Sequence, residues 1–238
     1  MKKLICVSLT WVAFVLGMVA EAEDNQELLM KRRDCAPLYA VQKRSCVMQR
    51  VYHCDLNGQS IQRVESIDES GLFFVDFTDL DGNTIESWWR GGANSVLEIV
   101  EVRKLFSRAK LASTGIDNFD LTWLTINPWF AEPIQEIIFG EIKVTGEVLN
   151  IDGVMFTVAI HKGYTQTNSF REDYEKYEYL DLDTGAFFWG GSPEEGEPSY
   201  APVEVIFPKK PEFQIDRPQY DCGAMSSIAP LKGQSTRG

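Results

Sequence analysis

Residues 78–89 read TDLDGNTIESWW, and the Asp81-Gly82 pair at the centre marks a turn between two strands. Asp-Gly pairs supply the positive φ angles that two-residue type I′ hairpin turns require. The pattern occurs twice, because residues 55–61 read DLNGQSI where residues 79–85 read DLDGNTI. The stretch therefore predicts a β-hairpin, repeated along the chain.

The spacing of turn signals gives the fold class. Signals of this kind fall at 57–58, 70–71, 81–82 and 91–92. The residues between them are rich in Thr, Ile, Val, Phe and Trp, as in strands. We therefore predict a mainly β protein, an antiparallel meander that forms a barrel, half-barrel or sandwich with minor helices.

Two further segments are predicted to include helix. Residues 95–112 begin with the capping-box pair Ser95 and Glu98, yet VLEIVEV is typical of a strand. We predict a strand followed by a short helix that ends before Gly115. Pro133 is expected to begin a helical turn over 133–139.

A calcium loop is the alternative interpretation of residues 78–89. An EF-hand loop needs oxygen ligands at its first and twelfth positions around an invariant glycine. With Gly82 as that glycine, these positions are Phe77 and Trp88, which offer none. The sequence therefore favours a turn, and no metal or cofactor is predicted.

The N-terminus has the layout of a secretory signal peptide. Lys2 and Lys3 precede an apolar run that ends near Ala20, and Ala20-Glu21-Ala22 forms a small-x-small cleavage site. Cleavage after Ala22 predicts a periplasmic or extracellular protein with no membrane span left. The retained membrane anchor is the alternative.

The remaining chain is predicted to divide into two parts. A β-rich domain covers 23–190, and a Pro-rich extended segment covers 191–238, with VEVIF as a last strand and a disordered tail. Cys222 is expected to tether this segment to the domain.

Four cysteines remain after cleavage: Cys35, Cys46, Cys54 and Cys222. An even number in an exported chain predicts two disulfides. If CVMQRVYHC is one strand, its ends lie about 26 Å apart, whereas a disulfide needs Cα atoms within about 7 Å. That excludes Cys46–Cys54. We prefer Cys35–Cys46 with Cys54–Cys222, and the other crossed pairing stays open.

The net charge of the chain restricts the kinds of molecule that it is expected to bind. The net charge of −12 disfavours nucleic acids, whose phosphates are bound through Lys and Arg, and anionic lipid surfaces. An apolar small molecule, a glycan or an envelope protein remains as a possible partner.

No catalytic signature accompanies the residues that carry chemistry. The two histidines, His53 and His161, lie in or at the end of predicted strands without a recognisable motif. Carboxylates are plentiful, and the pairs Glu175 with Asp181 and Asp76 with Glu86 are conceivable acid–base pairs. Nothing in the spacing selects them, so no catalytic residue is predicted.

The aromatic residues are more suggestive of binding. Trp88 and Trp89 are consecutive and point to opposite faces of a strand, while Trp129 and Phe130 lie in a Pro-flanked loop. Core packing is the alternative role of all four. We predict an exported, disulfide-stabilised protein that binds a ligand through these residues. The alternatives are an exported hydrolase using a carboxylate pair or His161, and a structural component of the cell envelope.

Overall fold

The computed structural model describes residues 35–56, 58–90, 95–126, 132–192, 200–214 and 217–222. Its strands in chain order are β1 Cys35–Lys43, β2 Val47–Leu56, β3 Gln59–Asp68, β4 Gly71–Thr78, β5 Thr84–Trp89, β6 Ser95–Lys104, β7 Ile116–Ile126, β8 Ile134–Ile151, β9 Val154–Gln166, β10 Arg171–Asp181, β11 Ala186–Gly191 and β12 Pro202–Ile206. Its helices are α2 Arg108–Thr114 and the 3-10 helix η4 Pro211–Gln214.

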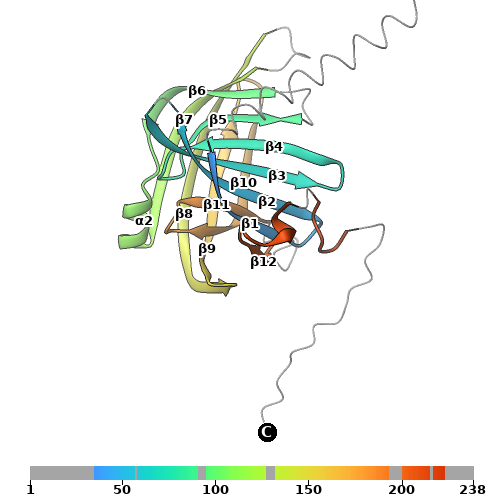
Figure 1. The fold of residues 1–238 in the computed structure, drawn as a ribbon. Coiled ribbons are helices and arrows are strands. Elements are labelled where there is room, and N and C mark those ends of the chain that lie inside the picture. Colours follow the sequence, from blue (N-terminus) through green and yellow to red (C-terminus); the bar gives the residue numbers. More distant parts are fainter. Residues whose placement is uncertain are drawn as a thin grey trace, which may run out of the picture.

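The strands form one antiparallel sheet in which each of β1 to β11 pairs with its neighbour in the sequence, and β12 returns to pair with β1. Figure 1 shows this sheet wrapping around so that its two ends approach each other. The result is a nearly closed twelve-stranded barrel, which confirms the predicted fold class.

Side chains rather than a strand ladder join the two ends of the sheet. Tyr39 and Val41 of β1 pack in one buried cluster with Phe156 of β9, Tyr179 of β10 and Phe188 of β11. The ends of the sheet thus overlap, and apolar burial closes the barrel where pairing stops.

Polar contacts also join β1 to β10 and β11, and we call the junction of β1 with β9, β10 and β11 the seam. The hydroxyl of Tyr39 donates to Asp181 Oδ2 at 2.6 Å, and the buried Lys43 donates through Nζ to the carbonyl oxygen of Trp189. Burial lowers the pKa of Lys43 to about 7, although the charge of Glu178 opposes this shift. The seam therefore places an ionisable lysine beside the barrel interior.

The turn at 79–83 joins β4 to β5 and contacts the segment before α2 and β11. Asp79 Oδ1 accepts hydrogen bonds from the backbone N–H groups of Asp81 and Asn83, each at 2.9 Å. Asn83 in turn bonds to both backbone groups of Phe106, which precedes α2. Gly82 has a φ of 94°, and a Cβ there would collide with the Phe187 ring.

The type of this turn was predicted wrongly. A type I′ turn has two central residues, but five residues separate Thr78 from Thr84, and Gly82 rather than Asp81 takes the positive φ. The carboxylate of Asp79 explains the longer loop, because it satisfies loop N–H groups that a tight turn would pair across the strands.

Two other secondary-structure predictions have opposite outcomes. The predicted strand and short helix are confirmed, and Ser107 caps α2 while Gly115 ends it with a φ of 77°. The helical turn over 133–139 is wrong, because Ile134 begins β8. The β-branched residues of this segment favour a strand once β7 is available for pairing.

Two disulfides crosslink the described part of the chain. Cys35 pairs with Cys54 across the β1–β2 ladder, and Cys46 pairs with Cys222. The preferred pairing of Cys35 with Cys46 is therefore wrong, and the other crossed pairing is present. Cys35 and Cys54 are direct neighbours in the register of the hairpin, whereas Cys46 lies in the turn at its far end.

The segment after residue 190 contributes to the fold where it is described. β12 pairs with β1, and Phe213 of η4 packs with Met48 and Ile67. Arg50 also donates to the carbonyl oxygen of Phe213 at 3.1 Å. The C-terminal disulfide thus fixes a segment that covers one face of β1 to β3.

We predict that Gly82→Ala lowers the free energy of unfolding by about 2–4 kcal/mol, because it combines a strained φ with a collision against Phe187. Gly58→Ala is the matched control. Gly58 has a φ of 81° but open space around its Cβ position, so only strain of about 1 kcal/mol is expected. Urea unfolding monitors both, and equal losses would contradict the role of Phe187.

We predict that removing Cys46–Cys222 costs more stability than removing Cys35–Cys54. The two bonds span 176 and 19 residues, which corresponds to losses of about 5 and about 3 kcal/mol in the chain-entropy account. Paired Cys→Ser variants compared by urea unfolding measure the difference. Peptide mapping without reduction checks the pairing, and a Cys35–Cys46 peptide would contradict the structure.

Candidate functional site

The barrel contains a partly open cavity of about 420 Å³ that continues into a second lobe of about 270 Å³. Both lobes are bordered by Asp76, Trp123, Lys176, Glu178 and Phe187. The wall of the larger lobe is mostly apolar and comprises Leu97, Phe106, Phe119, Leu121, Trp123, Ile138, Ile142 and Phe187. A mainly apolar cavity with a few polar groups is typical of a small-molecule site.

A buried polar network forms one side of the cavity. His161 of β9 contacts Glu178 Oε1 through Nδ1 at 3.1 Å, and Nε2 contacts the hydroxyl of Tyr174 at 3.1 Å. Burial lowers the pKa of His161 despite its bond to Glu178, so the ring is neutral at pH 7. Since a carboxylate only accepts, Nδ1 donates to Glu178 and the Tyr174 hydroxyl donates to Nε2.

Lys176 completes the network and fixes the charge of Glu178. Its Nζ lies 3.0 Å from Glu178 Oε1. Burial alone would raise the pKa of Glu178, but the charge of Lys176 and the bond from His161 lower it to about 2. Glu178 is therefore a carboxylate with its charge already offset.

Tyr174 and His161 extend this network away from Glu178. Burial and the charge of Glu178 raise the pKa of Tyr174, which makes the phenol a poor nucleophile. The neutral His161 is hydrogen-bonded through both ring nitrogens, to Glu178 and to Tyr174.

Two glycines make room for these side chains. Gly140 of β8 and Gly163 of β9 are paired across the ladder. A Cβ at Gly140 would collide with His161 and Phe119, and one at Gly163 would collide with Tyr174. The rings of Phe119, His161 and Tyr174 pack edge to face, with centroids 5.4 and 5.1 Å apart. The glycines therefore decide where the polar network lies.

Asp76 of β4 lines both lobes of the cavity. Its Oδ1 accepts from Ser87 Oγ at 2.6 Å, and its Oδ2 accepts from Thr84 Oγ1 at 3.3 Å. Burial raises the pKa of Asp76 to about 7, against the lowering effect of Ser87, Thr84 and Lys176. No ion pair to Asp76 is present in the part of the chain that the structure describes.

Of the residues predicted as ligand contacts, the two that the structure describes, Trp88 and Trp89, are not among those that line this cavity. Trp88 is buried in a cluster with Val75 and Phe77, and Trp89 is 48% exposed on β5. Trp129 and Phe130 lie outside the described residues. Their role in binding stays a prediction.

The carboxylate pairs considered from the sequence are not brought together. Asp76 is paired with Ser87 while Glu86 is paired with Phe77, so the two acids point to opposite faces of the sheet. Glu175 and Asp181 are six residues apart in β10, which corresponds to about 20 Å. Glu175 forms an exposed ion pair with Lys162 instead.

Sequence reasoning missed most of the cavity. Trp123 contributes its indole to the wall, and its buried Nε1–H has no hydrogen-bond partner among the described residues. Alternation of LTWLT predicts which of these residues share a face, and Leu121 and Trp123 do. The sequence does not show that this face encloses a space.

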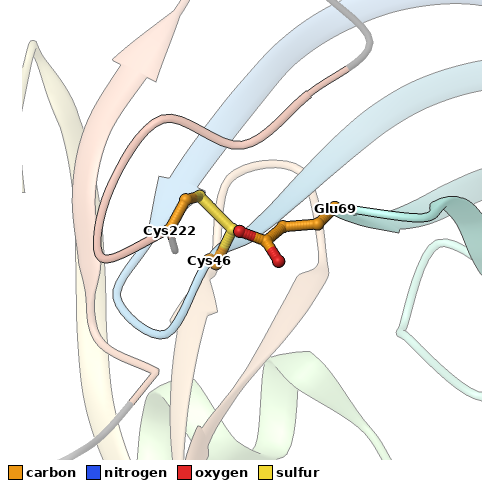
Figure 2. Close-up of side chains that lie close together, drawn as sticks. All are labelled: Cys46, Glu69 and Cys222. Carbon is orange, nitrogen blue, oxygen red and sulfur yellow. A yellow bond between two sulfur atoms is a disulfide. The ribbon is translucent and has the colours of Figure 1, made fainter. Parts of the chain in front are cut away.

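A second cluster joins the two halves of the C-terminal disulfide to an acid. Figure 2 shows the carboxylate of Glu69 beside Cys46 and Cys222, and the potential ligand atoms lie within 4.8 Å of one another. Both sulfur atoms are consumed by the disulfide. Because a metal binds the thiolate form, this cluster holds no metal while the bond is intact.

The comparisons with known proteins add little. No protein-family model matches the sequence, and no curated protein shows significant similarity to it. The crystal structure of the hypothetical lipoprotein YmcC from Escherichia coli (K12) is similar at a TM-score of 0.37 and 14% identity, covering 82% of this chain and 94% of that one. A likeness of this degree carries no inference.

Two features bear on the compartment. The two disulfides fit a protein that folds in an oxidising environment outside the cytosol. Within the described residues, no helix has both the length and the apolar character needed to span a bilayer. The predicted signal peptide, residues 1–22, lies outside the described residues.

We predict that Asp76 makes stability fall with rising pH. Its pKa is raised from 3.8 to about 7 in the folded chain, so the folded state keeps a proton that the unfolded chain releases. This contribution is complete below about pH 4 and is lost by about pH 7. It amounts to about 4 kcal/mol, for a shift of about three pKa units at about 1.4 kcal/mol per unit.

Comparison with Asp76→Asn isolates this contribution, because every other group titrates in both proteins. The stability of the variant relative to the parent, measured by urea unfolding from pH 4 to pH 8, should increase with pH. A constant difference would show that Asp76 titrates normally.

Proposed function

We propose that this protein is an exported binding protein whose barrel interior holds a small, largely apolar ligand. The main observation that supports this proposal is the cavity of about 420 Å³. This volume falls in the range of about 300–1,000 Å³ that is typical of small-molecule sites. Apolar residues dominate its wall, and Asp76, His161, Tyr174, Lys176 and Glu178 supply polar groups at defined positions.

The compartment is part of this proposal. A signal peptide over residues 1–22 and the two disulfides support a periplasmic or secreted location. The net charge of −12 supports partners other than nucleic acid.

A hydrolase and an envelope component are less well supported. Glu178 is already bonded to both Lys176 and His161, so it is not free to act as a base. An envelope component with no small-molecule site gives no physical reason for a cavity of this size.

The test is the binding of N-phenyl-1-naphthylamine, a neutral apolar dye whose fluorescence rises in apolar surroundings. We expect saturable enhancement with the purified chain after extraction of copurified lipids. Ile138→Trp places a larger side chain in the cavity wall and should weaken binding at least about 10-fold, because it fills the space.

The matched control is Met155→Trp, which adds an indole at a position that is 48% exposed near the turn between β8 and β9. It should bind the dye as the parent does. Circular dichroism verifies that both variants fold. Absence of saturable binding, or equal binding by Ile138→Trp, would overturn the proposal.

A further inference from the structure

The charges inside the cavity are unbalanced. The acids that line it are Asp76, Glu136 and Glu178, and Lys176 is the lining lysine among the described residues. His161 is neutral at pH 7 because burial lowers its pKa. The interior therefore has a surplus of negative charge when its carboxyl groups are ionised.

Among these three acids, Asp76 differs in its hydrogen-bond and ion-pair partners. Glu178 is paired with Lys176 at 3.0 Å and also accepts from His161. Glu136 accepts from Thr125 Oγ1 at 3.2 Å, near the end of β7. Among the described residues, Asp76 has hydrogen bonds from the neutral hydroxyls of Ser87 and Thr84 and feels the charge of Lys176 without forming an ion pair with it. An enclosed carboxylate without a cation is costly, since hydroxyls do not offset its charge.

Unused polar and aromatic groups surround the same carboxylate. Thr78 is 6% exposed, borders the smaller lobe, and its Oγ1 has no hydrogen-bond partner within the described chain. Trp123 and Phe187 line both lobes together with Asp76. A hydroxyl oxygen accepts from an ammonium, and aromatic faces attract cations.

We propose that the ligand carries a cationic amine that pairs with Asp76, while its apolar part lies along the wall formed by Leu121, Ile138 and Ile142. This inference rests on the proposed binding function and names its ligand class. The ammonium would supply the charge that Asp76 lacks, and Thr78 would accept one of its N–H bonds.

Other headgroups fit less well. A carboxylate or phosphate would face Asp76, Glu136 and Glu178, and the lysine that could offset it is already bonded to Glu178. A neutral alcohol could bond to Asp76 but would leave its charge uncompensated. The order of affinity is therefore amine, then alcohol, then carboxylate.

The experiment uses decylamine, decanol and decanoate as competitors of the dye at pH 7.5, with chains of equal length. We expect decylamine to bind at least about 10-fold more tightly than decanol, and decanoate to bind most weakly. In Asp76→Asn the ratio of amine to alcohol affinity should fall to about one. Glu147→Gln, an exposed acid on β8, is the control and should keep the ratio of the parent.

The outcomes separate the two proposals. If the dye itself shows no saturable binding, the binding function fails; if the dye binds but decylamine does not displace it, the amine is overturned and the cavity remains the site. Equal affinities of decylamine and decanol would be compatible with binding in the cavity but would contradict the proposal that the ligand is an amine. Tightest binding of decanoate would also overturn it, in favour of an anion held by Lys176.

A measurement on the parent protein alone gives a second test. Pairing with an ammonium ionises Asp76, so decylamine binding at pH 6 should release a proton, seen as a heat that depends on the ionisation enthalpy of the buffer. The other groups that face Asp76 across the cavity are Glu136, His161, Tyr174, Lys176 and Glu178. Asp76→Asn separates their contribution, and proton release that persists in this variant would contradict the role of Asp76.

Discussion

The contact between the two ends of the sheet is the constraint on which the rest of the structure depends. Every other strand boundary has a backbone ladder, but at the seam β1 meets β9 to β11 through side chains. Tyr39 and Lys43 provide the polar part of this contact, and their partners are Asp181 and the backbone at Trp189. Without the seam, the sheet would remain open and its interior face would be exposed to solvent.

The loop at 79–83 also supports the closed barrel, because it connects β4 and β5 to residues of the cavity wall. Asp79 organises the loop, Asn83 binds the backbone of Phe106, and Gly82 leaves space for Phe187. Phe106 and Phe187 pack edge to face at 5.2 Å and line the cavity. Hydrogen bonds from the N–H groups of Asp81 and Asn83 occupy the carboxylate of Asp79 and hold the loop in its conformation.

The sequence determined the fold class more completely than the site. Glycine turns at regular spacing predict a meander, because each turn acts on residues that are close in the chain. Residues 133–139 were misjudged because their strand form depends on pairing with β7, which local propensity ignores. Asp76 and Glu178 border one cavity although about a hundred residues separate them, and only closure of the barrel brings them together.

The cavity itself follows from size and from small residues. Barrels of about eight strands are filled by their own side chains, whereas a larger number of strands leaves interior space. Gly140 and Gly163 keep the rings of Phe119 and Tyr174 against the wall. A serine or asparagine at position 76 would bond to Ser87 without the cost of a buried charge. The chain has an aspartate there instead, with hydroxyls and aromatic rings around it. This combination is the physical reason to regard the Asp76 carboxylate as part of the proposed binding site.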